Sequence, residues 1–169
     1  MAPERSRTFL SRSPEATRAL GSAIGRALAP DTIVALVGDL GSGKTCFVQG
    51  LARGLDVRDP VTSPTYALLQ TYSGRLELYH FDAWMEGRER AFLLDGGIEW
   101  MHAGGVAAIE WAERVDEVLP RPLLRVAFEH VSAGERRLTL SVEGEGAVAE
   151  RLIALVLHLE PQTDLDSVR

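Results

Sequence analysis

The chain has 169 residues and a formal net charge of −6, with 46% hydrophobic and 25% charged residues. This length suffices for one domain with its own core, and the composition excludes wholesale disorder or a fibrous repeat. No hydrophobic run approaches the roughly 20 residues of a membrane span, and the acidic balance disfavours direct, strong binding to RNA or DNA.

Cysteine and histidine usage bears on the cellular compartment and on metal binding. Cys46 is the only cysteine, which excludes an intrachain disulfide and fits a reducing compartment. The four histidines lie far apart and offer no spacing typical of a zinc site. The N-terminal stretch contains arginines but lacks the apolar core of a secretory signal. We therefore expect a cytoplasmic protein with no zinc and no membrane attachment.

The first predicted element is an amphipathic helix over residues 16–29. Ser13 suits its N-cap, Pro14 suits its first position, and apolar residues recur along it at helical spacing. A Pro-Asp pair at residues 30–31 then ends the helix. Residues 32–37 form a short apolar run rich in β-branched side chains, which is typical of a strand buried on both faces.

A glycine-rich loop follows this strand directly and precedes a predicted helix over residues 47–55. Residues 38–45 read Gly-Asp-Leu-Gly-Ser-Gly-Lys-Thr, the pattern of a phosphate-binding P-loop. Its glycines let successive N–H groups turn toward an anion, and the helix dipole adds to the attraction. We expect Lys44 to bridge phosphates and the Thr45 hydroxyl to ligate Mg²⁺. The predicted nucleotide-contacting residues of this stretch are Gly38, Asp39, Leu40, Gly41, Ser42, Gly43, Lys44, Thr45 and Cys46.

Lys44 is also the only lysine among the 18 basic residues of the chain. A lysine kept at one position needs a chemical reason, because arginine serves equally well as a solvated surface charge. A compact ammonium fits between phosphates where a planar guanidinium would clash with the loop backbone. The lack of any other lysine removes the guanine-specific Asn-Lys-x-Asp motif, which disfavours a regulatory GTPase.

An extended, proline-fixed segment over residues 62–66 leads into a predicted β-hairpin. The hairpin strands are residues 67–72 and 75–81, which flank a Ser-Gly turn, and this antiparallel pair makes the sheet mixed. Thr65 could sense a γ-phosphate as a switch residue does. The alternative for this segment is an ordinary Ser-Pro loop.

Two acidic residues end predicted strands. Asp82 follows the second hairpin strand, and Glu110 ends the apolar run over residues 106–110, at the edge where ligands of open α/β sheets collect. A magnesium-nucleotide site needs such carboxylates. We therefore predict Thr45, Asp82 and Glu110 as metal ligands, and Lys44, Asp82 and Glu110 as catalytic residues. The alternative for each acid is a strand-end carboxylate that caps a neighbouring helix.

Two further residues, Glu99 and His80, bear on this assignment. The tripeptide Ile-Glu-Trp occurs at residues 98–100 and 109–111, and only the second copy follows a strand-like run, so we choose Glu110 over Glu99. His80 lies two residues before Asp82, on the same face of the predicted strand. We interpret it as a core histidine with satisfied hydrogen bonds, the alternative being a residue that orients the acids.

The remaining elements complete an α/β fold. We expect a charged helix over residues 85–94, strands over residues 123–130 and 137–143, and a helix over residues 147–158. The predicted fold class is a three-layer P-loop nucleoside triphosphate hydrolase with a mixed, mainly parallel central sheet that contains the β-hairpin. Residues 1–159 are expected to form a single domain, and residues 160–169 a polar, disordered tail.

Four motifs in this order resemble the bacterial TsaE (YjeE) family, the small ATPase of tRNA threonylcarbamoyladenosine synthesis. The resemblance covers roughly residues 9–140, and its motifs are residues 38–45, Ser63-Pro64-Thr65-Tyr66, Tyr79-His80-Phe81-Asp82 and Ile109-Glu110-Trp111. It implies Mg²⁺-dependent ATP binding and slow hydrolysis in support of the TsaB and TsaD proteins, which place threonylcarbamoyl on the adenosine beside the anticodon. It also implies that tRNA contacts the chain only indirectly, through the complex.

The resemblance assigns roles to particular residues. It implies that Lys44 and Thr45 hold phosphate and metal, and that Asp82 and Glu110 serve metal and water. It further implies that Thr65 belongs to a switch-like loop and that Trp111 lies near the nucleotide.

The chain departs from the family pattern just after the aspartate. The family usually has an arginine there, in an Asp-Leu-Tyr-Arg type segment, and Met85 takes its place in this chain. Arg88 or Arg90 could reach the same region.

Two other functions stay open at the level of sequence. A small-molecule or nucleoside kinase shares the P-loop and the size, but it needs a second pocket for an acceptor hydroxyl, and no acceptor signature is visible. A nucleotide-gated assembly factor would use binding to shift a conformational population, with incidental hydrolysis.

Overall fold

The structure is a computed structural model that describes residues 4–64, 67–84, 87–160 and 165–168. Within these residues, every helix is too short or too polar to traverse a lipid bilayer. The described 3-10 helices are η2 (Ala112–Arg114) and η3 (Asp116–Val118), and η1 (Leu93–Gly97) is a π-helical turn. The elements in chain order are β1 (Ser6–Ser11), α1 (Pro14–Ala27), β2 (Thr32–Gly38), α2 (Lys44–Gly54), β3 (Leu69–Tyr72), β4 (Leu78–Asp82), α3 (Glu89–Phe92), η1 (Leu93–Gly97), α4 (Ile98–Trp100), β5 (Val106–Glu110), η2 (Ala112–Arg114), η3 (Asp116–Val118), β6 (Leu123–His130), β7 (Arg136–Glu143), α5 (Ala147–Leu157) and β8 (Leu165–Val168).

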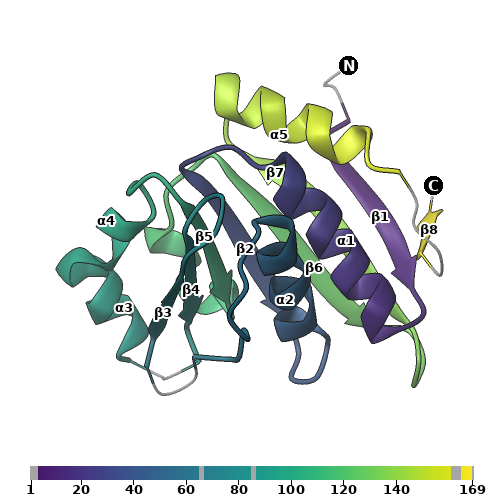
Figure 1. Cartoon of the computed structure of the whole chain (residues 1–169), viewed down its shortest axis with the longest axis horizontal. Coiled ribbons are helices and arrows are strands. Elements are labelled where there is room, and N and C mark those ends of the chain that lie inside the picture. Colours follow the sequence, from purple (N-terminus) through teal and green to yellow (C-terminus); the bar gives the residue numbers. More distant parts are fainter. Residues whose placement is uncertain (1–3, 65–66, 85–86, 161–164, 169) are drawn as a thin grey trace.

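The strands of the described residues form one sheet in the order β3-β4-β5-β2-β6-β7-β1-β8 (Figure 1). The four central strands, β4, β5, β2 and β6, pair in parallel. The flanking pairs β3–β4, β6–β7, β7–β1 and β1–β8 are antiparallel. The predicted mixed sheet with its β-hairpin is confirmed, with the parallel pairing confined to the centre. The loop after β2 therefore lies beside the carboxyl end of β5, where α/β proteins bind their ligands.

Helices cover both faces of the sheet and give three layers. On one face, buried side chains of α1, α2 and α5 pack against β2, β6, β7 and β1. On the other face, Leu93, Met101 and the segment after β5 pack against β2, β4 and β5. Alternation along each strand divides its side chains between these two clusters. In β4, Leu78 belongs to the first cluster, whereas Tyr79 and Phe81 belong to the second.

Glycines let α1 and α2 pack with their backbones close together. A Cβ at Gly50 would lie 2.0 Å from the carbonyl oxygen of Arg18, and a Cβ at Gly54 would lie 2.3 Å from that of Ser22. Both distances are far below any normal contact, so only glycine allows this approach. Because α2 begins at the end of the phosphate-binding loop, this packing fixes the position of the loop relative to the sheet.

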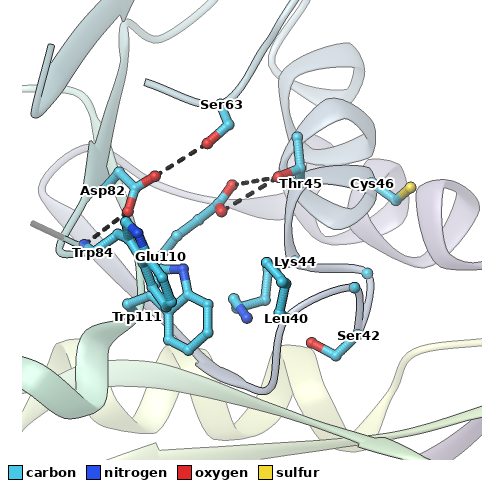
Figure 2. A pocket seen from close by; sticks show the side chains of 12 residues that line it. Leu40, Ser42, Lys44, Thr45, Cys46, Ser63, Asp82, Trp84, Glu110 and Trp111 are labelled. Atoms are coloured by element: carbon cyan, nitrogen blue, oxygen red, sulfur yellow. Dashed lines mark hydrogen bonds between the residues drawn. The ribbon is translucent and has the colours of Figure 1, made fainter. Parts of the chain in front are cut away.

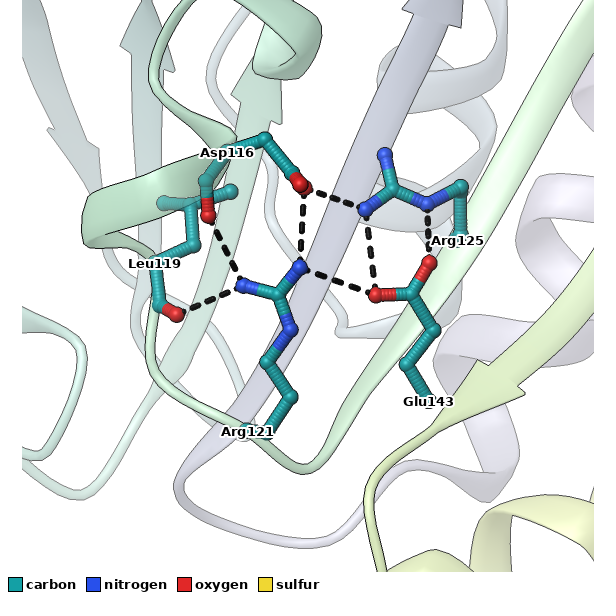
Figure 3. Close-up of polar contacts among 5 residues, drawn as sticks. All are labelled: Asp116, Leu119, Arg121, Arg125 and Glu143. Atoms are coloured by element: carbon teal, nitrogen blue, oxygen red, sulfur yellow. Dashed lines mark hydrogen bonds and ion pairs between the residues drawn. The ribbon is translucent and has the colours of Figure 1, made fainter.

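A cluster of charged side chains joins three segments on the face of the sheet away from α1 and α2 (Figure 3). Arg125 of β6 contacts Asp116 of η3 and donates to Glu143 of β7 at 2.5 Å. Arg121 donates to the same two carboxylates at 2.9 and 3.0 Å. The cluster thus ties the segment that follows β5 to the β6–β7 pair.

The segment Leu165–Val168 near the C-terminus differs from the expectation of disorder. Residues 160–169 were expected to be disordered, but Leu165–Val168 form β8, which pairs antiparallel with β1. The reason lies at the edge of the sheet, where β1 offers unpaired backbone N–H and C=O groups, and pairing with these does not depend on a strong apolar pattern. β1 itself carries little sequence signal, because Ser6–Ser11 reads Ser-Arg-Thr-Phe-Leu-Ser.

The helix expected over residues 85–94 is shorter and more irregular than its sequence suggests. Among the described residues of this range, only Glu89–Phe92 forms an α-helix, α3, and a π-helical turn then leads into α4. Gly96, with φ of 122°, interrupts the helical backbone inside this turn. Met85, the residue at the position of the family arginine, lies outside the described residues.

Candidate nucleotide-binding site

The loop between β2 and α2 uses backbone conformations that favour glycine. Gly38, Gly41 and Gly43 have φ values of 151°, 72° and 107°. At Gly38, a Cβ would also lie 2.8 Å from the Phe128 carbonyl oxygen, so a side chain would not fit there. Gly43 is the N-cap of α2 and brings no capping side chain. The first N–H groups of α2 therefore remain available to an anion, in the manner of phosphate-binding loops.

Lys44 folds back over this loop. Its Nζ donates to the carbonyl oxygens of Gly38 at 2.5 Å and Asp39 at 2.9 Å, and lies 3.9 Å from the centroid of the Trp111 ring. Burial lowers the pKa of Lys44, while the nearby carboxylates, led by Glu113 and Glu110, act to raise it. The ammonium has neutral acceptors as its hydrogen-bond partners, so a phosphate oxygen would be a stronger partner than either carbonyl.

Asp82 and Glu110 lie side by side at the carboxyl ends of two neighbouring parallel strands. They are register partners on β4 and β5, and each is 3% exposed. The Thr45 hydroxyl donates to Glu110, at 3.0 Å to Oε1 and 3.3 Å to Oε2 (Figure 2). Asp82 accepts from the Ser63 hydroxyl at 3.1 Å and from the Trp84 backbone N–H at 2.9 Å. Glu110 is therefore held at the start of α2, and Asp82 is held by Ser63 and Trp84.

Two tryptophans form the wall opposite the loop. Trp111 directly follows Glu110 and has φ of 57°, a left-handed conformation that is uncommon for a residue with a side chain. Its ring lies 4.5 Å, centroid to centroid, from that of Trp84. The Arg114 guanidinium lies 4.7 Å from the Trp84 ring and 5.5 Å from the Trp111 ring. The strained backbone therefore occurs at the residue whose ring covers the Lys44 ammonium.

These side chains line a cavity of about 430 Å³, shown in Figure 2. The lining residues are Leu40, Gly41, Ser42, Gly43, Lys44, Thr45, Cys46, Ser63, Asp82, Trp84, Glu110 and Trp111.

A second cavity of about 160 Å³ adjoins the loop on its β1 and β7 side. It shares Gly41, Ser42, Gly43 and Cys46 with the first cavity. The Ser42 hydroxyl is buried and has no hydrogen-bond partner among the described residues. Its other lining residues are Ser11, Ser13, Pro14, Thr17, Ala133, Gly134 and Arg136.

The structure brings most of the predicted site residues together. Gly38 and Asp39 take part through their carbonyl oxygens, and the loop from Leu40 to Cys46 lines the first cavity with Asp82, Glu110 and Trp111. Thr65 lies outside the described residues, so its predicted switch role stays a prediction. Glu99 lies exposed in the short helix α4 and does not line the cavity.

Several residues of the site were not predicted from sequence. Ser63 and Trp84 line the first cavity, and Ser11 and Arg136 line the second. Ser63 stands in the Ser-Pro-Thr segment and Trp84 stands two residues after Asp82, so adjacency to the predicted motifs could have indicated both. The residues of the second cavity carry no such signal, because only the fold brings β1 and the β6–β7 turn to the loop.

A mixed sheet with a parallel centre and this loop between β2 and α2 define the fold class of the P-loop nucleoside triphosphatases. Residues 11–138 match the family described as "Threonylcarbamoyl adenosine biosynthesis protein TsaE". The chain belongs to the TsaE family, whose role is in tRNA threonylcarbamoyladenosine biosynthesis.

Individual relatives agree with this assignment. The chain is 40% identical over 132 residues to a tRNA threonylcarbamoyladenosine biosynthesis protein TsaE of Treponema pallidum, covering 78% of this chain and 98% of that one. It is 36% identical over 134 residues to that of Bacillus subtilis, covering 78% and 83% of the two chains. The crystal structure of Bacillus subtilis YdiB matches the fold with a TM-score of 0.74 and 29% identity, covering 92% of this chain and 94% of that one.

Proposed function

We propose that the protein binds Mg²⁺-ATP and hydrolyses it in support of tRNA threonylcarbamoylation, acting with TsaB and TsaD. The observation that carries this proposal is the hydrogen bond from Thr45 to Glu110, inside the cavity that also holds Asp82 and Lys44. Phosphate-binding, metal-binding and acidic groups thereby converge on one space, which is what phosphoryl transfer to water requires.

The oxygen atoms in the cavity fit magnesium. Mg²⁺ takes oxygen ligands, keeps several waters and uses one or two carboxylates beside phosphate oxygens. In the described part of the chain, no three His, Cys, Asp or Glu side chains gather into a complete metal cage. Thr45, Asp82 and Glu110 instead offer a hydroxyl and two carboxylates. When bound, Mg²⁺ would offset the charge of the β- and γ-phosphates.

The hydrogen-bond directions support a proposed task for each side chain. Because the Thr45 hydroxyl donates its hydrogen to Glu110, the lone pairs of its oxygen remain available to a metal. Lys44 exchanges the carbonyl oxygens of Gly38 and Asp39 for phosphate oxygens. Glu110 keeps Oε2, which has only the longer contact to Thr45, for a water molecule. Asp82 serves as the second acid, fixed by its two hydrogen-bond donors.

The second cavity is the proposed place for the nucleoside. It adjoins the loop on the side away from Asp82 and Glu110, as the base of a bound nucleotide must when its γ-phosphate points toward the acids. The Ser42 hydroxyl, which has no partner in the described part of the chain, and the Arg136 side chain offer polar contacts there. This arrangement supports binding of a whole nucleoside triphosphate rather than of phosphate alone.

Family membership and charge support the proposed partners. The net charge of −6 does not favour direct binding to tRNA, so TsaB and TsaD would hold most of the tRNA. The chain would then act as the nucleotide-hydrolysing subunit of a cytoplasmic complex.

Two glutamates in identical tripeptides provide a matched test. Glu110→Gln removes the charge from the cavity, whereas Glu99→Gln makes the same change at an exposed residue of α4. We expect Glu110→Gln to retain ATP binding in calorimetry and to lose turnover in a phosphate-release assay. Glu99→Gln is expected to match the wild type in both, and Lys44→Ala to lose binding.

The same assays separate the other functions. Equal turnover by Glu110→Gln and wild type would contradict the proposed hydrolysis site. Phosphate passing to a metabolite much faster than to water, in a screen of acceptors, would identify a kinase instead. Full tRNA modification with Glu110→Gln would favour an assembly factor whose hydrolysis is incidental.

A further inference from the structure

His80 lies completely buried directly beside the proposed hydrolysis site. Its Nε2 is 2.9 Å from Oε1 of Glu110, and its side chain has no exposed area. Because an ionised carboxylate only accepts hydrogen bonds, Nε2 carries the hydrogen and donates it. The other ring nitrogen, Nδ1, has no hydrogen-bond partner among the described residues. His80 therefore makes one directed contact, to Glu110, and is not the fully satisfied core histidine that the sequence suggested.

Strand register explains how this contact arises. His80 on β4 pairs with Ala108 on β5, and Glu110 follows two residues later on the same face of the sheet. The small side chain of Ala108 leaves room for the imidazole to reach diagonally toward the acid. Diagonal neighbours on adjacent strands lie within reach of long side chains. A histidine at this register thus places a hydrogen-bond donor within reach of Glu110.

The polar side chain costs stability, so packing alone does not account for it. A buried ring nitrogen without a partner loses its hydration, and an apolar residue of similar size would avoid that loss. The cost is offset only at Nε2, where the ring contacts Glu110. The position of His80 is thus suited to holding the acid rather than to filling the core.

We infer that His80 is a positioning residue for ATP hydrolysis, an inference that rests on the proposed function. Oε1 of Glu110 accepts hydrogen bonds from both His80 and Thr45, so two donors hold the carboxylate in place. Because these hydrogen bonds hold Oε1, they also fix the orientation of Oε2, which is the oxygen left for water. His80 does not line the cavity and acts only through Glu110.

The decisive comparison is His80→Gln against His80→Leu. Glutamine places an amide N–H near the position of Nε2, whereas leucine fills a similar volume without a donor. We expect His80→Leu to lower kcat for ATP by about 10–100-fold, the usual effect of removing a residue that orients a metal ligand. We expect His80→Gln to stay within a few-fold of wild type, with KM for ATP nearly unchanged in both. Equal kcat in His80→Leu and wild type would overturn the inference.

A stability measurement and a second variant show whether misfolding of His80→Leu explains a loss of activity. Thermal unfolding reports whether His80→Leu is folded, and His80→Asn supplies a second donor-removing variant, because its amide is one methylene too short to reach Glu110. Loss of turnover in both folded variants, with rescue by glutamine, supports positioning. A loss of the same size in the glutamine variant would overturn it.

A nucleotide-free measurement separates this inference from the proposed function. In a long-range proton–nitrogen NMR spectrum, we expect the Nε2-bound hydrogen of His80 to be protected from exchange in the wild type. Glu110→Ala should remove that protection, and Glu99→Gln should not. A wild type that hydrolyses no ATP would overturn the proposed function but would leave the holding of Glu110 by His80 standing. A His80 signal unaffected by Glu110→Ala would overturn the positioning role, whatever the activity.

Discussion

Replacing Arg125 by Met removes the residue that joins η3, β6 and β7. Its side chain is 17% exposed and contacts both Asp116 and Glu143 (Figure 3). Hydrogen bonds between charged groups contribute about 1.5–3 kcal/mol, but the two carboxylates are 44% and 34% exposed, which weakens them. Arg121 remains to hold both carboxylates. We therefore expect the free energy of unfolding to fall by about 1–2 kcal/mol, or Tm by roughly 2–8 °C.

The loss should depend on pH in a defined direction. Burial raises the pKa of Asp116, but hydrogen bonds and charge from Arg125 and then Arg121 outweigh it, so the net pKa is lowered. The hydrogen bond to Arg125 is the main cause of the lowered pKa of Glu143. Carboxylates with lowered folded pKa values stabilise the fold above their unfolded pKa of about 4, and this contribution disappears as pH falls through the folded pKa. The difference between wild type and variant should shrink below about pH 4.

Urea unfolding at neutral and acidic pH measures this difference. Arg137→Met is the control, because its exposed pair with Glu129 on the same strands should contribute less than about 1 kcal/mol. ATP binding should be unchanged in both variants, since neither residue lines the cavity. The reasoning fails if Arg125→Met is no more destabilising than Arg137→Met at pH 7, or if its effect grows as pH falls.

Three further predictions concern the loop and its supports. Gly50→Ala puts a methyl 2.0 Å from a carbonyl oxygen of α1, so we expect the free energy of unfolding in urea to fall by about 1–3 kcal/mol. Gly134→Ala is the control, because a Cβ there meets no atom within 4 Å, and it should not lower stability. Equal stabilities of the two variants would contradict the packing argument. Thr45→Val should weaken Mg²⁺-dependent ATP binding in calorimetry and Thr45→Ser should retain it, so equal Mg²⁺ dependence would argue against the hydroxyl ligand. ATP should change the fluorescence of Trp111 as Lys44 leaves its ring, and a Trp111→Phe variant that keeps the whole signal would refute that assignment.

Local patterns in the sequence predicted the centre of the fold well. The apolar run before the loop, the glycines and the helix after it lie within about 25 residues, so periodicity and spacing identify β2, the loop and α2. The hairpin strands and the strand before Glu110 carried similar local signals. The fold class and the family are confirmed, and the site assignment derived from them stays a prediction with supporting geometry.

Long-range pairing accounts for what the sequence could not indicate. β1 and β8 pair through backbone groups at the edge of the sheet, and their side-chain patterns are weak. The contact between His80 and Glu110 depends on the register of β4 against β5, and the sequence of neither strand specifies this register by itself. The second cavity likewise exists only because the sheet order brings β1 and β7 to the loop.

The most direct test of the account is a reconstituted tRNA threonylcarbamoylation assay with TsaB and TsaD, in which ATP hydrolysis and modified tRNA are measured together. The account predicts that the partners stimulate hydrolysis by the wild-type chain. It also predicts that Glu110→Gln binds ATP but sustains neither hydrolysis nor modification, while Glu99→Gln sustains both. Full modification with Glu110→Gln, or no effect of the partners on hydrolysis, would contradict it.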